Sequence, residues 1–121
     1  MPKQILGCFL GILLLSGCYY DNKEDLYQFV DQSCEVAQAT YAADVLPILE
    51  LNCISCHNNG NPQGGVTLEG YDNCKQHVDN GSLLGSIEHA SGYAPMPPGG
   101  RLAPCDIQTI KTWIENGAPN N

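Results

Sequence analysis

The chain has 121 residues, enough for one small domain with a single core and too few for two independent enzyme domains. It has seven cysteines, thirteen glycines and eight prolines but only 7% aromatic residues, so its apolar core is thin and we expect support from disulfides or a cofactor. Five Lys and Arg against thirteen Asp and Glu give a net charge of -8, and the basic residues form no cluster, which argues against nucleic acid as a partner.

The first 17 residues have the pattern of an export signal. Lys3 precedes an apolar run of about eleven residues, which is shorter than the roughly 20 that a membrane-spanning helix needs. Leu15-Ser16-Gly17-Cys18 follows and resembles the lipobox of bacterial lipoproteins, in which cleavage leaves the cysteine as a lipid-modified N-terminus. We therefore expect residues 1–17 to be a lipoprotein signal peptide, with an ordinary secretory peptide as the alternative.

Cys18 is then the lipid anchor of an exported protein on the periplasmic face of a bacterial membrane. The outer membrane is the expected location, and the cell surface is an alternative. Residues 18–40 are polar and acidic for most of their length, without a useful apolar period, which indicates a tether. We expect the folded domain to span residues 41–121.

Three short helices are predicted in the first two thirds of this domain. The first has apolar residues at helical spacing, with Asp44 as its cap and Pro47 in its first turn, and runs into Cys53. The second covers about 73–80 and stops at Gly81. The third starts with Ser82 as its cap and buries Leu83, Leu84 and Ile87.

The last helix has the clearest pattern. Pro104 suits its first position, Asp106 suits its positive end, and Gly117 with Pro119 ends it. Ala103 is a poor cap because it has no side-chain acceptor. The apolar stripe of this helix consists of Ile107, Ile110, Trp113 and Ile114. No strand is predicted.

Cys53-Ile54-Ser55-Cys56-His57 is the strongest chemical signal in the chain. Two thiols one helical turn apart can add across the two vinyl groups of a haem, and the next residue places an imidazole under the iron. The alternatives are half a zinc site, a redox dithiol or a disulfide between neighbours. The remaining Cys and His residues do not form a second pair at zinc-ligand spacing, and the flanks do not suggest the strand and helix of a thioredoxin-type site.

Met96 is the expected second axial ligand, opposite His57. Once Met1 leaves with the signal peptide, Met96 carries the only thioether of the mature chain. It lies in Ala94-Pro95-Met96-Pro97-Pro98-Gly99-Gly100, where proline stiffens the loop on both sides. His77 and His89 are rival sixth ligands that we expect to be surface residues.

These features together resemble a small class I c-type cytochrome, specifically the single-domain lipoprotein cytochromes of bacterial surfaces. The resemblance covers about residues 41–121 and includes the final segment Ile-Gln-Thr-Ile-Lys-Thr-Trp-Ile-Glu-Asn-Gly-Ala-Pro. It implies an all-α fold in which the first and last helices cross beside one covalent haem, with Trp113 at or near the crossing. In such proteins a backbone carbonyl of the loop after the motif commonly accepts from the histidine, and Pro62 or a neighbour in 58–65 could supply it. Arg101 is a candidate partner for a haem propionate, and an exposed arginine is the alternative.

The cysteines at 34, 74 and 105 remain, an odd number in an oxidising compartment. Related sequences tend to carry cysteines that match positions 34 and 105, so the resemblance favours a Cys34–Cys105 disulfide, which would stabilise the fold by roughly 4 kcal/mol. A Cys74–Cys105 disulfide is the alternative.

The expected function is one-electron transfer by a single covalent haem c, and not enzymatic catalysis. With both axial positions filled by protein, the iron has no open site for a substrate. Redox partner proteins of the respiratory chain or an exported oxidoreductase are the expected partners, and the acidic surface favours a basic docking patch. A haem gas sensor, or a module of a larger oxidoreductase, is the alternative. The residues expected to line or flank the macrocycle are Val66, Leu68, Leu83, Leu84, Ile87, Ile107, Ile110 and Ile114.

Overall fold

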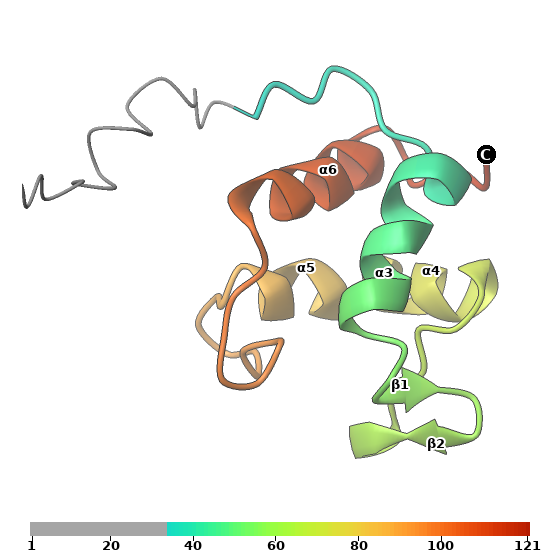
Figure 1. Cartoon of the computed structure of the whole chain (residues 1–121), viewed down its shortest axis with the longest axis vertical. Coiled ribbons are helices and arrows are strands. Elements are labelled where there is room, and N and C mark those ends of the chain that lie inside the picture. The colour runs from blue at the N-terminus through green and yellow to red at the C-terminus, as the bar shows by residue number, and fades with distance from the viewer. Residues whose placement is uncertain (1–33) are drawn as a thin grey trace, which may run out of the picture. The chain divides into compact units, whose positions relative to one another are not determined.

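Short helices and one small ribbon make up the computed structural model, which describes residues 34–121 (Figure 1). The expected signal peptide, Cys18 and the tether up to residue 33 lie outside this range. The helices are α3 (Leu46–Asn52), α4 (Tyr71–Asp79), α5 (Ser82–Ile87) and α6 (Pro104–Glu115), with a π-helical turn η2 (Tyr41–Val45) and a 3-10 turn η3 (Gln63–Gly65). The helix-rich class is therefore confirmed for the described residues. No helix within 34–121 combines the length and the apolar character that crossing a membrane requires.

The first helical segment starts one turn earlier than predicted, because η2 precedes α3 without a break. Thr40, not Asp44, is its cap: the Thr40 hydroxyl accepts from the Ala43 amide at 3.3 Å. The Asp44 carboxylate accepts in return from the Thr40 amide at 2.7 Å and from the Thr40 hydroxyl at 2.8 Å, and these hydrogen bonds lower the pKa of Asp44. Pro47 lies in the first turn of α3, as predicted.

The next two helices follow the predicted pattern with small shifts. α4 begins two residues before the predicted 73–80 segment and ends before Gly81. Ser82 is the first residue of α5 and not its cap; Gly81 takes the cap position with φ 78°. Leu83 and Ile87 are buried as expected, whereas Leu84 is only half-buried. α6 covers residues 104–115 as its pattern indicates, and Ala103 makes no side-chain cap.

The two-stranded ribbon was not predicted. β1 (His57–Asn58) and β2 (Asn61–Pro62) are antiparallel, with His57 opposite Pro62. The Asn58 side chain holds the turn, since its Oδ1 atom accepts from the amides of Gly60 at 3.0 Å and Asn61 at 2.8 Å. Strands of two residues are too short to show the alternation by which sequence reveals a strand.

Trp113 lies at the contact between the first and last helical segments. Its side chain is fully buried, and its ring centroid is 5.6 Å from that of Tyr41 in η2 and 6.5 Å from that of Tyr71 in α4. The indole Nε1 donates to the Pro119 carbonyl at 2.9 Å, so its polar edge is satisfied. The core is built where α6 packs against η2, and this packing holds α3 in place because η2 leads directly into it.

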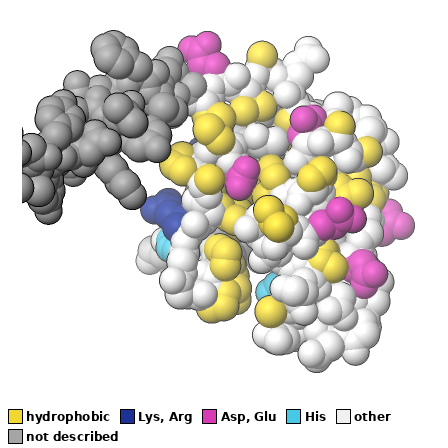
Figure 2. Space-filling model, viewed as in Figure 1, with side chains coloured by type: hydrophobic (Ala, Val, Ile, Leu, Met, Phe, Trp, Pro, Cys, Tyr) yellow, Lys and Arg dark blue, Asp and Glu magenta, His cyan; other side chains and the backbone are white. Residues whose placement is uncertain are grey.

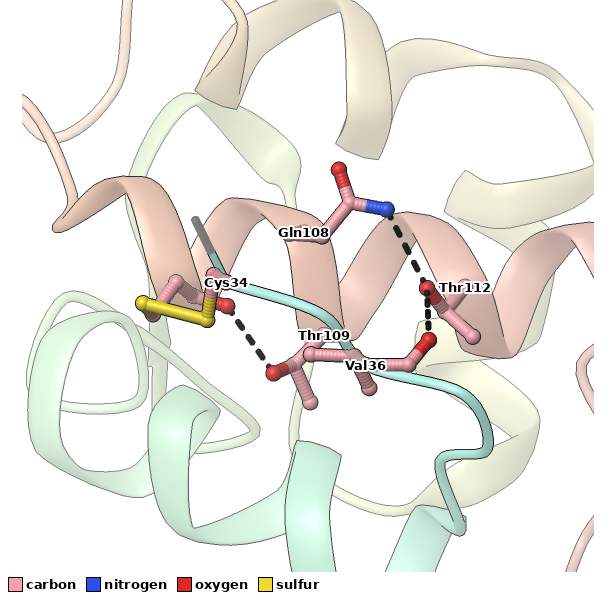
Figure 3. Close-up of a disulfide and its surroundings, with 6 residues drawn as sticks. Cys34, Val36, Gln108, Thr109 and Thr112 are labelled. Carbon is pink, nitrogen blue, oxygen red and sulfur yellow. Dashed lines mark hydrogen bonds between the residues drawn. A yellow bond between two sulfur atoms is a disulfide. The ribbon is translucent and has the colours of Figure 1, made fainter. Parts of the chain in front are cut away.

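A Cys34–Cys105 disulfide joins the start of the described chain to the first turn of α6 (Figure 3). Beside it, the Thr112 hydroxyl donates to the Val36 carbonyl at 3.3 Å and accepts from Gln108 Nε2 at 3.3 Å. Residues 34–40, which fall at the end of the expected tether, are thus held along α6. The expected pairing is confirmed, and the Cys74–Cys105 alternative is wrong because Cys74 is a free, buried thiol in α4.

Candidate functional site

The Cys-Ile-Ser-Cys-His segment forms a tight turn at the end of α3. The Cys53 amide donates to the Leu49 carbonyl at 2.8 Å and so completes the helix. The Cys53 carbonyl then accepts from the amides of Cys56 at 3.1 Å and His57 at 3.0 Å. These bonds fold the chain back on itself, so α3 and the turn present the two thiols and the imidazole together.

The His57 ring is oriented by a backbone carbonyl. Its Nδ1 atom lies 3.1 Å from the Val66 carbonyl oxygen, a contact in which the ring N–H donates. This leaves Nε2 as the ring nitrogen with a free lone pair. The expectation that Pro62 or a neighbour in 58–65 supplies the carbonyl is wrong, because the acceptor is Val66, the first residue after this range. Pro62 instead lies opposite His57 in the two-stranded ribbon, and the turn η3 brings Val66 to the ring.

Met96 is held against the end of α5. Its amide donates to the Ser86 carbonyl at 3.0 Å, and its side chain is half-buried. The loop of residues 90–103 thereby returns to α5 at one defined residue. Met96 lies 39 positions after His57 in the sequence, yet both reach the same space.

One cavity of about 160 Å³ brings the four predicted site residues together. A single buried water needs only roughly 10–15 Å³, so this space is much larger than a packing defect. The walls are mainly apolar. The lining residues include Cys53, Cys56, His57 and Met96, together with Asn52, Val66, Leu68, His77, Ser82, Leu83, Ser86, Ile87, Ala94, Pro97, Pro98 and Leu102.

Half of the eight expected apolar residues line this cavity, namely Val66, Leu68, Leu83 and Ile87. The others do not: Leu84 of α5 is partly buried against the core, and Ile107, Ile110 and Ile114 belong to the apolar stripe of α6, which packs into that core. Ser86 and Leu102 were missed, since neither carries a motif. Pro97 and Pro98 could have been inferred, because they directly follow Met96.

The two rival histidines occupy different places. His77 is half-buried and lines the cavity, contrary to the expected surface position, and its Nδ1 atom lies 3.0 Å from the Ser82 hydroxyl oxygen. His89 is exposed and does not line the cavity; its Nε2 atom lies 3.1 Å from the Met96 carbonyl oxygen. Of the two histidines, His89 is thus the one that contacts Met96, and it does so through the backbone carbonyl and not through the sulfur atom.

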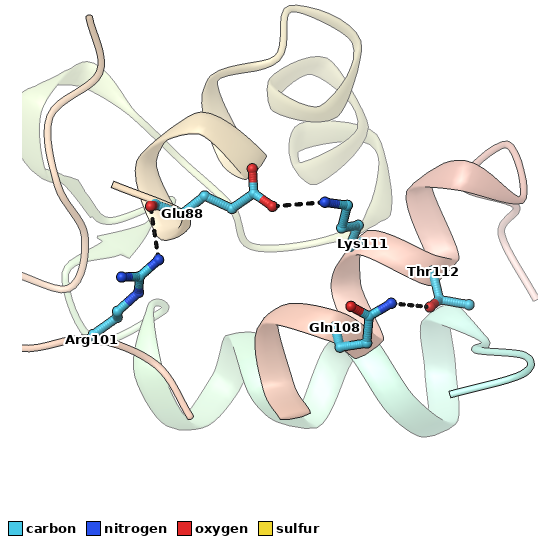
Figure 4. Close-up of polar contacts among 5 residues, drawn as sticks. All are labelled: Glu88, Arg101, Gln108, Lys111 and Thr112. Atoms are coloured by element: carbon cyan, nitrogen blue, oxygen red, sulfur yellow. Dashed lines mark hydrogen bonds and ion pairs between the residues drawn. The ribbon is translucent and has the colours of Figure 1, made fainter. Parts of the chain in front are cut away.

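Arg101 lies outside the cavity. Its guanidinium donates to the Glu88 carbonyl at 3.0 Å, and the Glu88 carboxylate pairs with Lys111 at 3.1 Å (Figure 4). Arg101 is therefore an exposed arginine, which was the alternative to a partner for a haem propionate. Its hydrogen bond to Glu88 links the end of the methionine loop to α5.

Burial affects one of the two site thiols, Cys53. It raises the pKa of Cys53 to about 11 and that of the neighbouring Cys74 to about 12. A redox dithiol of the thioredoxin type depends on a lowered thiol pKa, which Cys53 does not have. Among residues 34–121, no group of three or more His, Cys, Asp and Glu side chains is placed to hold a metal ion.

The site thus combines two thiols, an imidazole with one free nitrogen and a thioether around an apolar space. Such a set can form covalent bonds at sulfur and supply two axial ligands of different softness to one iron.

Comparison with protein-family models, with curated proteins and with solved structures finds no match for this chain.

Proposed function

We propose that this chain is a one-electron carrier with a single covalent haem c. Cys53 and Cys56 would hold the haem through thioether bonds, and His57 and Met96 would be the axial ligands of its iron. The observation that carries this proposal is that all four residues border one apolar cavity although Met96 comes from a distant loop. A class I cytochrome c fold, with the first and last helical segments crossing beside the haem, belongs to the same proposal.

The donor set fits this group. The contact between His57 Nδ1 and the Val66 carbonyl leaves Nε2 for a metal and raises the basicity of the ring. The Met96 thioether favours reduced iron, because a soft sulfur ligand stabilises the lower oxidation state. Apolar walls such as Leu68, Leu83 and Ile87 would exclude water from the haem.

The haem supplies the electron transfer itself, and the chain supplies binding and tuning. Filling both axial positions with protein side chains leaves no place for a substrate, which favours a carrier over an enzyme. The alternatives are a haem gas sensor, which needs a displaceable sixth ligand, and a module of a larger oxidoreductase. A pull-down from detergent-solubilised membranes separates a free carrier from such a module.

We further propose that the carrier is exported and anchored through lipidated Cys18, and that it meets redox partners of the respiratory chain or an exported oxidoreductase. Residues 34–121 contain nine acidic and three basic side chains, and Figure 2 shows acidic groups spread among apolar ones. A partner with a basic patch fits this surface, so electron exchange should slow as salt rises. A rate of electron exchange that does not change with salt concentration would contradict the proposed electrostatic docking.

The haem assignment is tested with protein made alongside intact cytochrome c maturation machinery. The purified chain should be red and should keep its haem after acid and organic extraction. Replacing both Cys53 and Cys56 with Ala should abolish this retention, whereas Cys74→Ala should not, because Cys74 does not line the cavity. A colourless wild type contradicts the proposal.

The ligand assignment is tested at Met96. Met96→Ala should convert a reduced protein that resists carbon monoxide into one that binds it readily, and Met96→His should lower the reduction potential. A wild type that already binds carbon monoxide readily would favour the gas sensor.

A further inference from the structure

Within residues 34–121, three helices are followed by a residue in the left-handed region, and in one of them this residue is not glycine. α4 and α6 end at Gly81 (φ 78°) and Gly117 (φ 89°), but the equivalent residue after α5 is His89 (φ 56°). This conformation is unfavourable for residues with a Cβ atom, and glycine is the usual residue there.

The ends of α5 and α6 have the same hydrogen bonds, so the difference lies in the residue and not in the type of ending. After α6, Gly117 donates to the carbonyl of Ile114 at 2.9 Å and Ala118 donates to that of Trp113 at 2.9 Å. After α5, the matching bonds run from His89 to Ser86 at 3.2 Å and from Ala90 to Gly85 at 2.9 Å. Both sets form a Schellman motif. A glycine would close α5 equally well, so the ending of the helix does not itself require the side chain of His89.

The side chain of His89 instead takes part in the contacts of Met96. The Nε2 atom of His89 lies 3.1 Å from the Met96 carbonyl oxygen, so the ring N–H donates to it. The Met96 amide donates to the Ser86 carbonyl at 3.0 Å, and this same carbonyl accepts from the His89 amide. Both backbone groups of Met96 are therefore held by the end of α5.

We propose that His89 is a positioning residue for the methionine ligand. This inference rests on the proposed function, in which the Met96 sulfur binds the haem iron. With the peptide groups on both sides of its Cα atom fixed, the Met96 side chain starts from a defined point at the cavity wall, and less freedom is lost when its sulfur binds.

The rest of the loop has anchors of its own. Arg101 donates to the Glu88 carbonyl, and Glu88 pairs with Lys111 of α6 (Figure 4). Loss of the His89 ring should therefore loosen Met96 locally and leave the fold intact.

The experiment compares His89→Gly, His89→Ala and His89→Gln in the haem-loaded protein. The probe is imidazole, which competes with Met96 for ferric iron. His89→Ala and His89→Gly should bind imidazole about fivefold more tightly than wild type, the factor that one ordinary hydrogen bond contributes. Both should also weaken the far-red sulfur-to-iron absorption band. His89→Gln keeps a donor at the end of a flexible side chain and should stay close to wild type.

The stability of these variants separates positioning from a structural role. His89→Gly relieves the left-handed strain, so its urea midpoint should equal or exceed that of wild type while its hold on Met96 weakens. Gly117→Ala is the matched control: it introduces the strain after α6, and its added Cβ atom meets nothing within 4 Å. It should lower the urea midpoint without changing imidazole affinity.

The two proposals fail in different ways. If wild-type protein lacks the far-red band, Met96 is not a ligand and the proposed function fails in that part. If wild type has the band, but His89→Ala and His89→Gly bind imidazole as wild type does, the positioning role of His89 is overturned.

Discussion

The Val66 carbonyl oxygen lies 3.1 Å from the Nδ1 atom of His57, although Val66 follows His57 by nine residues in the sequence. This contact orients the imidazole toward the cavity and leaves Nε2 free. It depends on the turn η3, because η3 delivers Val66 to the ring. The orientation of the proposed iron ligand is therefore set by the backbone of a loop residue whose side chain also lines the cavity.

Gly65→Ala should disturb this contact. Gly65 has φ 73° and precedes Val66, and an added Cβ atom would meet nothing within 4 Å, so the effect is purely conformational. We expect a loss of about 1 kcal/mol in the free energy of unfolding. Because a weaker hydrogen bond lowers the basicity of His57, the reduction potential should rise. Gly117→Ala imposes similar strain far from the ring and should leave the potential unchanged.

Thiol counting offers a test that needs no spectrum. Cys34 and Cys105 form a disulfide, and Cys53 and Cys56 would be consumed by the haem. The lipidated mature chain, denatured without reductant, should then react with one equivalent of an alkylating reagent, at Cys74. In the native state it should not react, because Cys74 is fully buried and burial raises its pKa to about 12. Three reactive thiols after denaturation would contradict haem attachment.

Removing the disulfide should destabilise the fold without altering the site. Cys34 and Cys105 are 71 positions apart, and the chain-entropy model gives about 4 kcal/mol for closing a loop of that length. The double variant Cys34→Ser with Cys105→Ser should lose about this much in urea unfolding. Its reduction potential should match that of wild type, since neither cysteine lines the cavity. Reduction of wild type by dithiothreitol is the control, and equal stability of the two forms would show that the bridge contributes nothing.

The free energy of unfolding should fall at alkaline pH because the Cys74 thiol is buried. Burial raises its pKa from 9.0 to about 12, so the folded state retains a proton that the unfolded chain releases. The resulting stability is fully present below about pH 9 and is lost as pH rises from there toward 12. Between roughly pH 8 and pH 10 wild type should lose about 1 kcal/mol more than Cys74→Ala. Burial also raises the pKa of Tyr41, but both proteins share that residue. Parallel pH profiles would show that the thiol does not ionise on unfolding.

The helix predictions succeeded where the determinants are local. Residues 104–115 form α6 because Pro104, Asp106 and the spacing of apolar residues act within a few turns. The predicted cap of the first helix, Asp44, was wrong because two candidate residues lie close together. Asp44 and Thr40 are both good caps four residues apart, and the sequence did not reveal that η2 adds a turn upstream.

The predictions about the cavity wall succeeded only in part, because they concern packing. Ile110 and Leu83 are both apolar residues on a helix face, yet Leu83 lines the cavity and Ile110 lies fully buried in the core. Helical periodicity says which face of a helix is apolar and not what that face meets. The expected surface position of His89 is confirmed, but its contact with the Met96 carbonyl, seven positions away, leaves no local signal in the sequence.

From the sequence alone one can derive a cysteine-rich chain, its helices and the Cys53-Ile54-Ser55-Cys56-His57 motif, because spacing within a few turns determines both. Only the tertiary structure brings Met96 to the same cavity as His57, selects Val66 as the carbonyl partner of the imidazole and places His89 on the methionine backbone. These contacts join segments that no local pattern relates. They arise because α6 packs on η2, and because the ends of the short helices determine where each loop returns.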